Sequence, residues 1–239
     1  MSGLSDTRSV DDIRVLDADE CARAVESVRA LRDRWIHRNL ITPFFTLGAA
    51  SYLDARGNKP RYAEYAAAAN PLLRERFSWL YDKVIGALGP VLDGPVALDP
   101  QHALPGFHVF EAHPIFRERT GELHCDLQYK HLDWSDRGEV DWARPLSFTL
   151  SLQLPSCGGG LNVWDLDYDE TVGLGKDEIR GIFNEREQRF HPYTEGSCAL
   201  HSGHLVHQIG PIPETVAGDA RITLQGHALR CGGVWRLYW

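Results

Sequence analysis

The chain has 239 residues, of which 43% are hydrophobic and 24% are charged, a composition typical of a soluble globular protein with a sizeable core. The formal net charge of −8 and the lack of a basic run argue against nucleic acid, because binding a phosphate backbone requires clustered Lys and Arg. The sequence also lacks the roughly 18 consecutive apolar residues of a membrane span, so neither nucleic acid nor a membrane is an expected partner.

The first residues and the cysteines indicate a cytoplasmic protein. The stretch MSGLSDTRSVDDIRVLDADE contains no long apolar segment of the kind that a signal peptide requires. The five cysteines are odd in number and lack a Cys-x-x-Cys pair, which argues against a disulfide framework and a zinc ribbon. We therefore expect reduced, mostly buried thiols and a cytoplasmic location.

Helices are predicted in the first part of the chain. Asp17 and Glu20 have the spacing of a capping box, and apolar residues follow at helical intervals, which predicts a helix over residues 17–35. A second apolar stripe of the same period predicts a helix over residues 70–89, with Asn70 as its N-terminal cap.

After Pro90 the sequence changes to short runs of β-branched and aromatic residues separated by Pro and Gly, which predicts a sheet core. In SFTLSLQL, residues 147–154, apolar and polar side chains alternate, as in a strand with one buried face. We expect one domain over residues 1–239, with a helical part over 1–90 and a β core over 91–239. The predicted class is α+β with a mainly β core.

The stretch GELHCDLQ holds the first group of side chains that suggests chemistry. On an extended strand, residues two apart point to the same side, so His124 and Asp126 present an imidazole and a carboxylate to one point. Such a pair is frequent by chance and is weak evidence alone. Further along, His207 offers a second imidazole, and Arg221 is followed two places later by Thr223. Two histidines and one carboxylate form the facial triad of non-haem Fe(II) oxygenases.

This ordered set resembles the Fe(II)/2-oxoglutarate-dependent oxygenase superfamily, in which HxD precedes a distal His and an Arg followed two residues later by Ser or Thr. The resemblance covers about residues 105–239. It implies a double-stranded β-helix, or jelly roll, flanked by the N-terminal helices. It also implies that His124, Asp126 and His207 hold Fe(II), and that 2-oxoglutarate and O2 are cosubstrates.

The resemblance implies that Arg221 and Thr223 bind the carboxylate of 2-oxoglutarate that lies far from the metal. Arginine offers a planar, permanently charged fork that matches a carboxylate, and a threonine on the same strand face adds a hydroxyl. The resemblance favours His207 over His201 and His204 as the distal ligand, because in the superfamily a small-residue turn and an apolar pair usually precede that ligand, as in HSGHLVHQIGP. For His201 and His204 we expect hydrogen-bonded roles near the site, without assigning either a function.

Four residues are candidates for contact with a substrate. Gln128 continues the strand face of the HxD pair, and His108 lies on an aromatic strand, where a structural histidine is the alternative. Asn162 and Trp164 follow the glycines of CGGGLNVWD, which allow either a close approach to a ligand or a hairpin turn.

Three functions are open from the sequence. The first is an Fe(II)/2-oxoglutarate-dependent hydroxylase of a small molecule, such as an amino acid or a natural-product intermediate, that forms succinate and CO2. The second is a cupin-like metal-dependent dioxygenase that does not use 2-oxoglutarate, and the third is a non-enzymatic β-sandwich ligand-binding protein. The resemblance favours the first, and the carboxylate at Asp126 favours hydroxylation over halogenation. The sequence does not indicate an oligomeric state.

Overall fold

The computed structural model describes residues 8–118, 120–214 and 216–239, and its strands form two sheets that are antiparallel apart from one pair. Part of the stretch in which no signal peptide was expected, residues 1–7, lies outside the described residues. The larger sheet runs in the order β1 (Val10–Arg14), β9 (Ser197–Ser202), β6 (Leu146–Gln153), β11 (Ala220–Cys231), β5 (Gly106–Glu111), β3 (Phe44–Leu47) and β2 (Ile36–His37).

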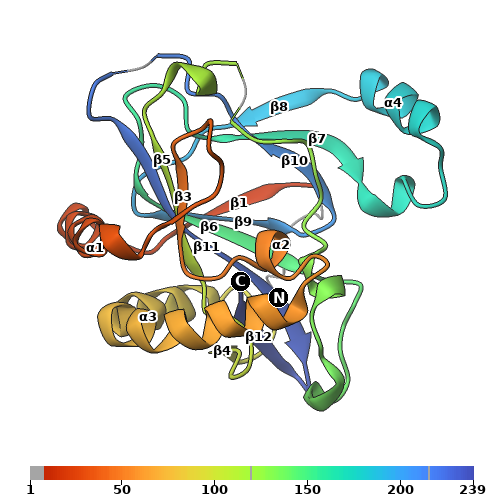
Figure 1. Ribbon diagram of the computed structural model, residues 1–239. Coiled ribbons are helices and arrows are strands. Elements are labelled where there is room, and N and C mark those ends of the chain that lie inside the picture. The colour runs from red at the N-terminus through yellow and green to blue at the C-terminus, as the bar shows by residue number, and fades with distance from the viewer. Residues whose placement is uncertain (1–7, 119, 215) are drawn as a thin grey trace.

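Two further strands extend the larger sheet, and three form the smaller one. Strand β12 (Val234–Tyr238) pairs with the second half of β11, and β4 (Val96–Leu98) pairs in parallel with β12. The smaller sheet consists of β10 (Leu205–Ile209), β7 (Leu161–Asp167) and β8 (Gln188–His191), with β7 in the middle. The arrangement is sandwich-like (Figure 1).

Helices α1 (Ala18–Ala30) and α3 (Lys59–Leu88) pack on the outer face of the larger sheet, and α2 (Ser51–Asp54) is a single turn beside α3 (Figure 1). Helix α4 (Lys176–Glu185) projects from the end of the smaller sheet. Short 3-10 helices lie in the connections: Arg32–Arg34, Pro114–Phe116, Gln128–His131, Ser135–Arg137 and Tyr168–Glu170.

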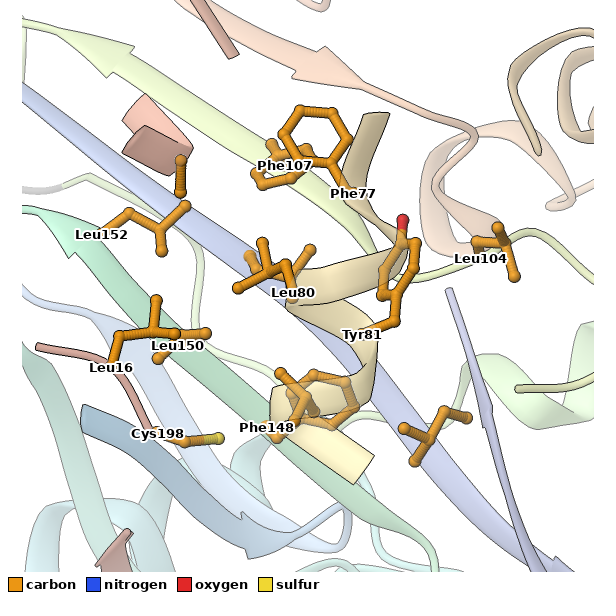
Figure 2. Packing of buried hydrophobic residues seen from close by; sticks show 14 of the residues in the cluster. Leu16, Phe77, Leu80, Tyr81, Leu104, Phe107, Phe148, Leu150, Leu152 and Cys198 are labelled. Atoms are coloured by element: carbon orange, nitrogen blue, oxygen red, sulfur yellow. The ribbon is translucent and has the colours of Figure 1, made fainter. Parts of the chain in front are cut away.

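The main core lies between α3 and the larger sheet. Figure 2 shows Phe77 of α3 beside Phe107 of β5, and Phe148 and Leu150 of β6 belong to the same buried cluster. All four side chains are fully buried, and each such residue contributes about 1.5–3 kcal/mol by leaving water. The alternation predicted for residues 147–154 is confirmed, because the polar residues between these apolar ones face away from the helices, toward the smaller sheet.

The N-terminal part is not purely helical, because it also supplies three strands to the larger sheet. Strand β1 pairs with β9 and β3 pairs with β5, so the two parts expected on either side of residue 90 share one sheet. The capping box of Asp17 and Glu20 is confirmed by both of its hydrogen bonds. The helix that follows ends at Ala30, short of the predicted residue 35.

The prediction that Asn70 caps a helix is wrong. Helix α3 begins at Lys59, with Asn58 as its cap, and continues through Pro71, where a proline removes one backbone hydrogen bond. Tertiary packing outweighs that loss, since the apolar stripe on both sides of Pro71 is buried. The Asn70 side chain instead donates to the His102 carbonyl and accepts from the Leu104 amide, both at 3.0 Å.

The different roles of Asn58 and Asn70 can be tested by measuring the free energy of unfolding of two variants. Asn70→Ala leaves a carbonyl and an amide of the 102–104 loop without their partner, which costs about 1–3 kcal/mol for each buried group. Asn58→Ala removes only a cap, which costs about 1 kcal/mol. We expect urea denaturation to show the larger loss of unfolding free energy for Asn70→Ala, whereas the opposite order would contradict the assignment.

The observed class agrees with the α+β prediction: antiparallel sheets with flanking helices. The more specific double-stranded β-helix stays a prediction. Among the described residues, none of the helices combines the length and the apolar character needed to cross a bilayer.

Candidate metal and cosubstrate site

The backbone brings the three predicted metal ligands together. His124 and His207 form an isolated antiparallel bridge, with the amide of His124 donating to the carbonyl of His207 at 3.0 Å and the reverse bond at 2.9 Å. The amide of Asp126 donates to the Gly203 carbonyl at 2.7 Å. The expected continuous strand over the HxD stretch is therefore wrong, since only His124 pairs and a 3-10 helix begins at Gln128.

The ring nitrogens are arranged for metal binding. Nδ1 of His124 lies 2.7 Å from the Glu122 carbonyl, and Nδ1 of His207 lies 2.8 Å from the Leu205 carbonyl. A carbonyl only accepts, so each Nδ1 carries the proton and each Nε2 presents its lone pair. These Nε2 atoms lie 3.7 Å and 3.5 Å from the oxygens of Asp126. The three donor atoms lie within 4.8 Å of one another, as ligands of one ion require.

Burial favours the neutral form of four histidines at the site, which are His207, His108, His201 and His227. It lowers the pKa of His207 to about 3, against the opposing effect of the Asp126 carboxylate. It also lowers the pKa values of His108, His201 and His227. Neutral imidazole is the form that binds a metal, so the fold holds the ligand in its competent state.

Acid sensitivity follows from these lowered pKa values. Below about pH 6.5 histidines of the unfolded chain bind protons that the folded chain does not bind, so the free energy of unfolding falls as pH falls. Each such histidine contributes a slope of about 1.4 kcal/mol per pH unit. We expect urea denaturation of the metal-free protein between pH 7.5 and 5 to show this loss, and His201→Gln to reduce the slope by one proton. A flat profile would contradict the burial of neutral imidazoles.

Arg221 is a buried cation without a matching anion. Its side chain has no exposed area, and its guanidinium lies between the rings of Phe110 and Tyr193, 5.5 and 5.4 Å from their centroids. Nε donates to the Gly159 carbonyl at 3.3 Å and Nη1 to the Thr223 hydroxyl at 3.4 Å, but Nη2 has no hydrogen-bond partner. Among the described residues, no carboxylate lies within ion-pair distance of it.

The unpaired guanidinium points to an anionic ligand. Burial lowers the pKa of Arg221, yet an arginine stays protonated in proteins, so the charge remains and is costly without a partner. A carboxylate would pair with the free Nη2 and offset that cost. The glycines of CGGG serve the turn beside it: Gly159 has a φ of +83° and presents its carbonyl to Arg221.

The triad and Arg221 line one cavity between the two sheets. Strand β11 explains part of this, because Arg221, Gln225 and His227 lie on its inner face, whereas the alternate residues Ile222 and Leu224 join the core under the helices. The side chains that complete the wall come from several other elements; they are Tyr52, Gln128, Thr149, Leu161, Tyr193, His201, Ile209 and Trp239.

The four expected substrate contacts have different positions. Gln128 lines the cavity, and its Nε2 donates to Asp126 Oδ1 at 2.7 Å. His108 is buried behind the wall, with Nε2 2.8 Å from the Tyr52 hydroxyl. Asn162 and Trp164 face away from the cavity, because Leu161 on the same strand lines it and side chains alternate. Trp164 packs on Phe183 of α4, 4.9 Å between ring centroids, so the structure does not bring it to the site.

Some cavity residues were missed. His227 is an even number of residues from Arg221 and Thr223 on one strand and so points to the same side, a signal that could have identified it. Tyr52 and Trp239 had no sequence signal, since long-range packing brings them to the site: Gly106 leaves the space for the indole, and a Cβ there would lie 2.2 Å from Trp239. His201 lines the cavity, whereas His204 lies outside it, 3.1 Å from the Tyr129 hydroxyl.

Comparison with known proteins gives the fold a context. No family model and no curated protein matches the chain. Among solved structures, an N-substituted L-amino acid dioxygenase from Burkholderia ambifaria AMMD, in complex with alpha-ketoglutarate (2-oxoglutarate), is similar with a TM-score of 0.55 and 15% identity. The similarity covers 96% of this chain and 86% of that one.

Two further structures share the arrangement. The non-heme alpha-ketoglutarate-dependent epimerase SnoN from nogalamycin biosynthesis has a TM-score of 0.54 at 13% identity, over 97% of this chain and 81% of its own. AviO1 from Streptomyces viridochromogenes Tue57 has a TM-score of 0.52 at 15% identity, over 92% and 89%. The chain therefore has the fold of Fe(II)/2-oxoglutarate-dependent oxygenases, and the fold that the resemblance implied is confirmed in its broad outline.

Proposed function

We propose that this protein is an Fe(II)- and 2-oxoglutarate-dependent oxygenase that acts on a small molecule, and that residues 1–239 form one oxygenase domain. The observation that carries the proposal is one cavity that holds both a two-histidine, one-carboxylate group and a buried, unpaired arginine. The first group suits a ferrous ion and the second suits an acidic cosubstrate. The likeness in fold supports the combination.

The residues fit both groups. His124, Asp126 and His207 would hold the iron through two Nε2 atoms and a carboxylate oxygen. Arg221 and Thr223 would hold the far carboxylate of 2-oxoglutarate, using the free Nη2. When bound, iron and 2-oxoglutarate would together use O2 to supply an oxidant strong enough to attack a C–H bond; one oxygen atom would enter succinate as CO2 is lost, and the other would be available for the substrate.

Hydroxylation is the proposed outcome, and the proposed substrate is an amino acid or a natural-product intermediate. The similar structures include a dioxygenase of N-substituted amino acids and an epimerase, so the fold accommodates more than one outcome on small molecules. The cavity suits a small substrate, because side chains from both sheets and from α2 line it. We further propose a cytoplasmic location, where iron stays reduced.

The test is succinate formation by purified protein with Fe(II), ascorbate and 2-oxoglutarate, screened against amino acids and small metabolites. We expect slow succinate formation without substrate and faster formation with the right one. Oxygen consumption that is independent of 2-oxoglutarate would favour the cupin-like alternative, in which Arg221 binds an acid group of the substrate itself. Absence of metal binding would favour the ligand-binding protein.

A further inference from the structure

The Gln128 side chain makes one hydrogen bond, and that bond is to a predicted metal ligand. Its Nε2 lies 2.7 Å from Asp126 Oδ1, and both side chains are buried. Only the amide nitrogen can donate to a carboxylate, so the orientation of the amide is fixed. The opposite atom, Oε1, is then an acceptor, and it is buried without a hydrogen-bond partner.

Both oxygens of Asp126 face the site. Oδ1 lies 3.7 Å from Nε2 of His124, and Oδ2 lies 3.5 Å from Nε2 of His207. A carboxylate in this position can bind an ion through one oxygen or through both. The amide of Gln128 donates a hydrogen bond to Oδ1. On the side of Oδ2, Nδ1 of His227 is 4.0 Å away and lies 3.0 Å from the Ser147 hydroxyl.

We propose that Gln128 is a positioning residue that keeps Asp126 a one-oxygen ligand, an inference that rests on the proposed function. An octahedral ion with three protein ligand atoms keeps three positions open. Chelation by 2-oxoglutarate would take two of them, and the third would remain available for O2. If both oxygens of Asp126 bound, only two positions would be left, and the cosubstrate would fill them.

The cost of the arrangement supports a functional role. A buried acceptor without a partner costs about 1–3 kcal/mol, and an apolar side chain of the same length would avoid that cost. The Asp126 backbone does not depend on Gln128, because its amide is bonded to Gly203. A Cβ at position 203 would lie 2.9 Å from the Asp126 carbonyl, so the close approach of these segments is set by the glycine. Removing the Gln128 amide should therefore leave Asp126 in place.

The experiment measures the water bound to the metal, with Mn(II) as the probe. Relaxation of water protons by the Mn(II)-loaded protein reports exchangeable water on the ion, before and after saturation with 2-oxoglutarate. For the wild type we expect the bound Mn(II) to enhance water-proton relaxation strongly, and part of this enhancement to remain after saturation with 2-oxoglutarate. For Gln128→Met we expect retained Mn(II) binding, a relaxation enhancement at least about twofold lower in the ternary complex, and succinate formation with Fe(II) about 10–100-fold slower.

Gln208→Met is the matched control, since Gln208 follows the ligand His207 but donates to the Gly121 carbonyl instead of to a carboxylate. Gln128→Leu, which also lacks the donor, should reproduce the loss if the methionine variant folds poorly. Wild-type relaxation in a folded Gln128 variant overturns this inference and leaves the proposed function standing. Failure of the wild type to bind Mn(II) and 2-oxoglutarate overturns both.

Discussion

Asp126→Ala is expected to abolish succinate formation, with a loss of more than about 100-fold. Removing a residue that only supports a metal ligand already lowers metal affinity or activity by about 10–100-fold, and Asp126 is proposed to bind the ion directly. It is also the only acidic member of the group that includes His124 and His207, so its loss removes the charge that attracts a cation. The measurement is succinate formation with saturating Fe(II) and 2-oxoglutarate, together with Co(II) affinity.

His204→Gln is the control for this variant. His204 lies in sequence between two histidines of the cavity, is also buried, and bonds to Tyr129 outside the cavity, where it forms a separate group with Asp167 and Asp169. We expect it to keep both Co(II) binding and succinate formation. Retained turnover in a folded Asp126→Ala protein, or loss in both variants, would show that the triad is not the metal site.

Arg221→Met is expected to impair 2-oxoglutarate binding and to stabilise the metal-free protein at the same time. Truncating one partner of a buried, hydrogen-bonded charge pair costs about 2–5 kcal/mol of binding, which would raise the KM for 2-oxoglutarate by about 30-fold or more. In the absence of ligand, however, the wild-type guanidinium is buried without an anion, and replacing it by an apolar side chain removes that penalty. The KM of Arg221→Lys for 2-oxoglutarate should lie between those of the wild type and Arg221→Met, since lysine keeps the charge but loses the planar, two-pronged donor group.

Arg38 is the matched comparison, because it is a second nearly buried arginine that does have its anion. Its Nη1 and Nη2 lie 2.6 and 2.8 Å from the oxygens of Asp54. Arg38→Met leaves that carboxylate buried and unpaired, which costs about 3–5 kcal/mol. Thermal unfolding without ligand should therefore show opposite shifts for the two variants. Equal destabilisation would mean that Arg221 is satisfied by the protein itself.

The site was more predictable than much of the fold around it. The resemblance to the superfamily, together with side-chain chemistry, singled out His124, Asp126, His207, Arg221 and Thr223, and the structure places all of them at one site. Their convergence does not depend on the predicted strand at HxD, because an isolated bridge to His207 achieves the same placement. Residue type and order were therefore sufficient to predict these site residues, although they did not predict the local backbone conformation.

Long-range packing explains what the sequence could not indicate. Asn70 has every local feature of a cap, yet the loop over 102–104 binds its side chain and the helix continues through Pro71. Trp164 was placed near the pocket from the glycines before it, but strand parity turns it toward α4. Such outcomes depend on which face of an element meets which partner, information that is spread over the whole chain.

The most direct test of the central claim is calorimetric titration of the wild type with 2-oxoglutarate under argon, with and without Fe(II). If the triad and Arg221 hold iron and 2-oxoglutarate side by side, the protein binds one equivalent of each. Iron should then tighten 2-oxoglutarate binding by about tenfold or more, or about 1.4 kcal/mol. Equal affinity with and without iron, or no binding of iron, would contradict the account.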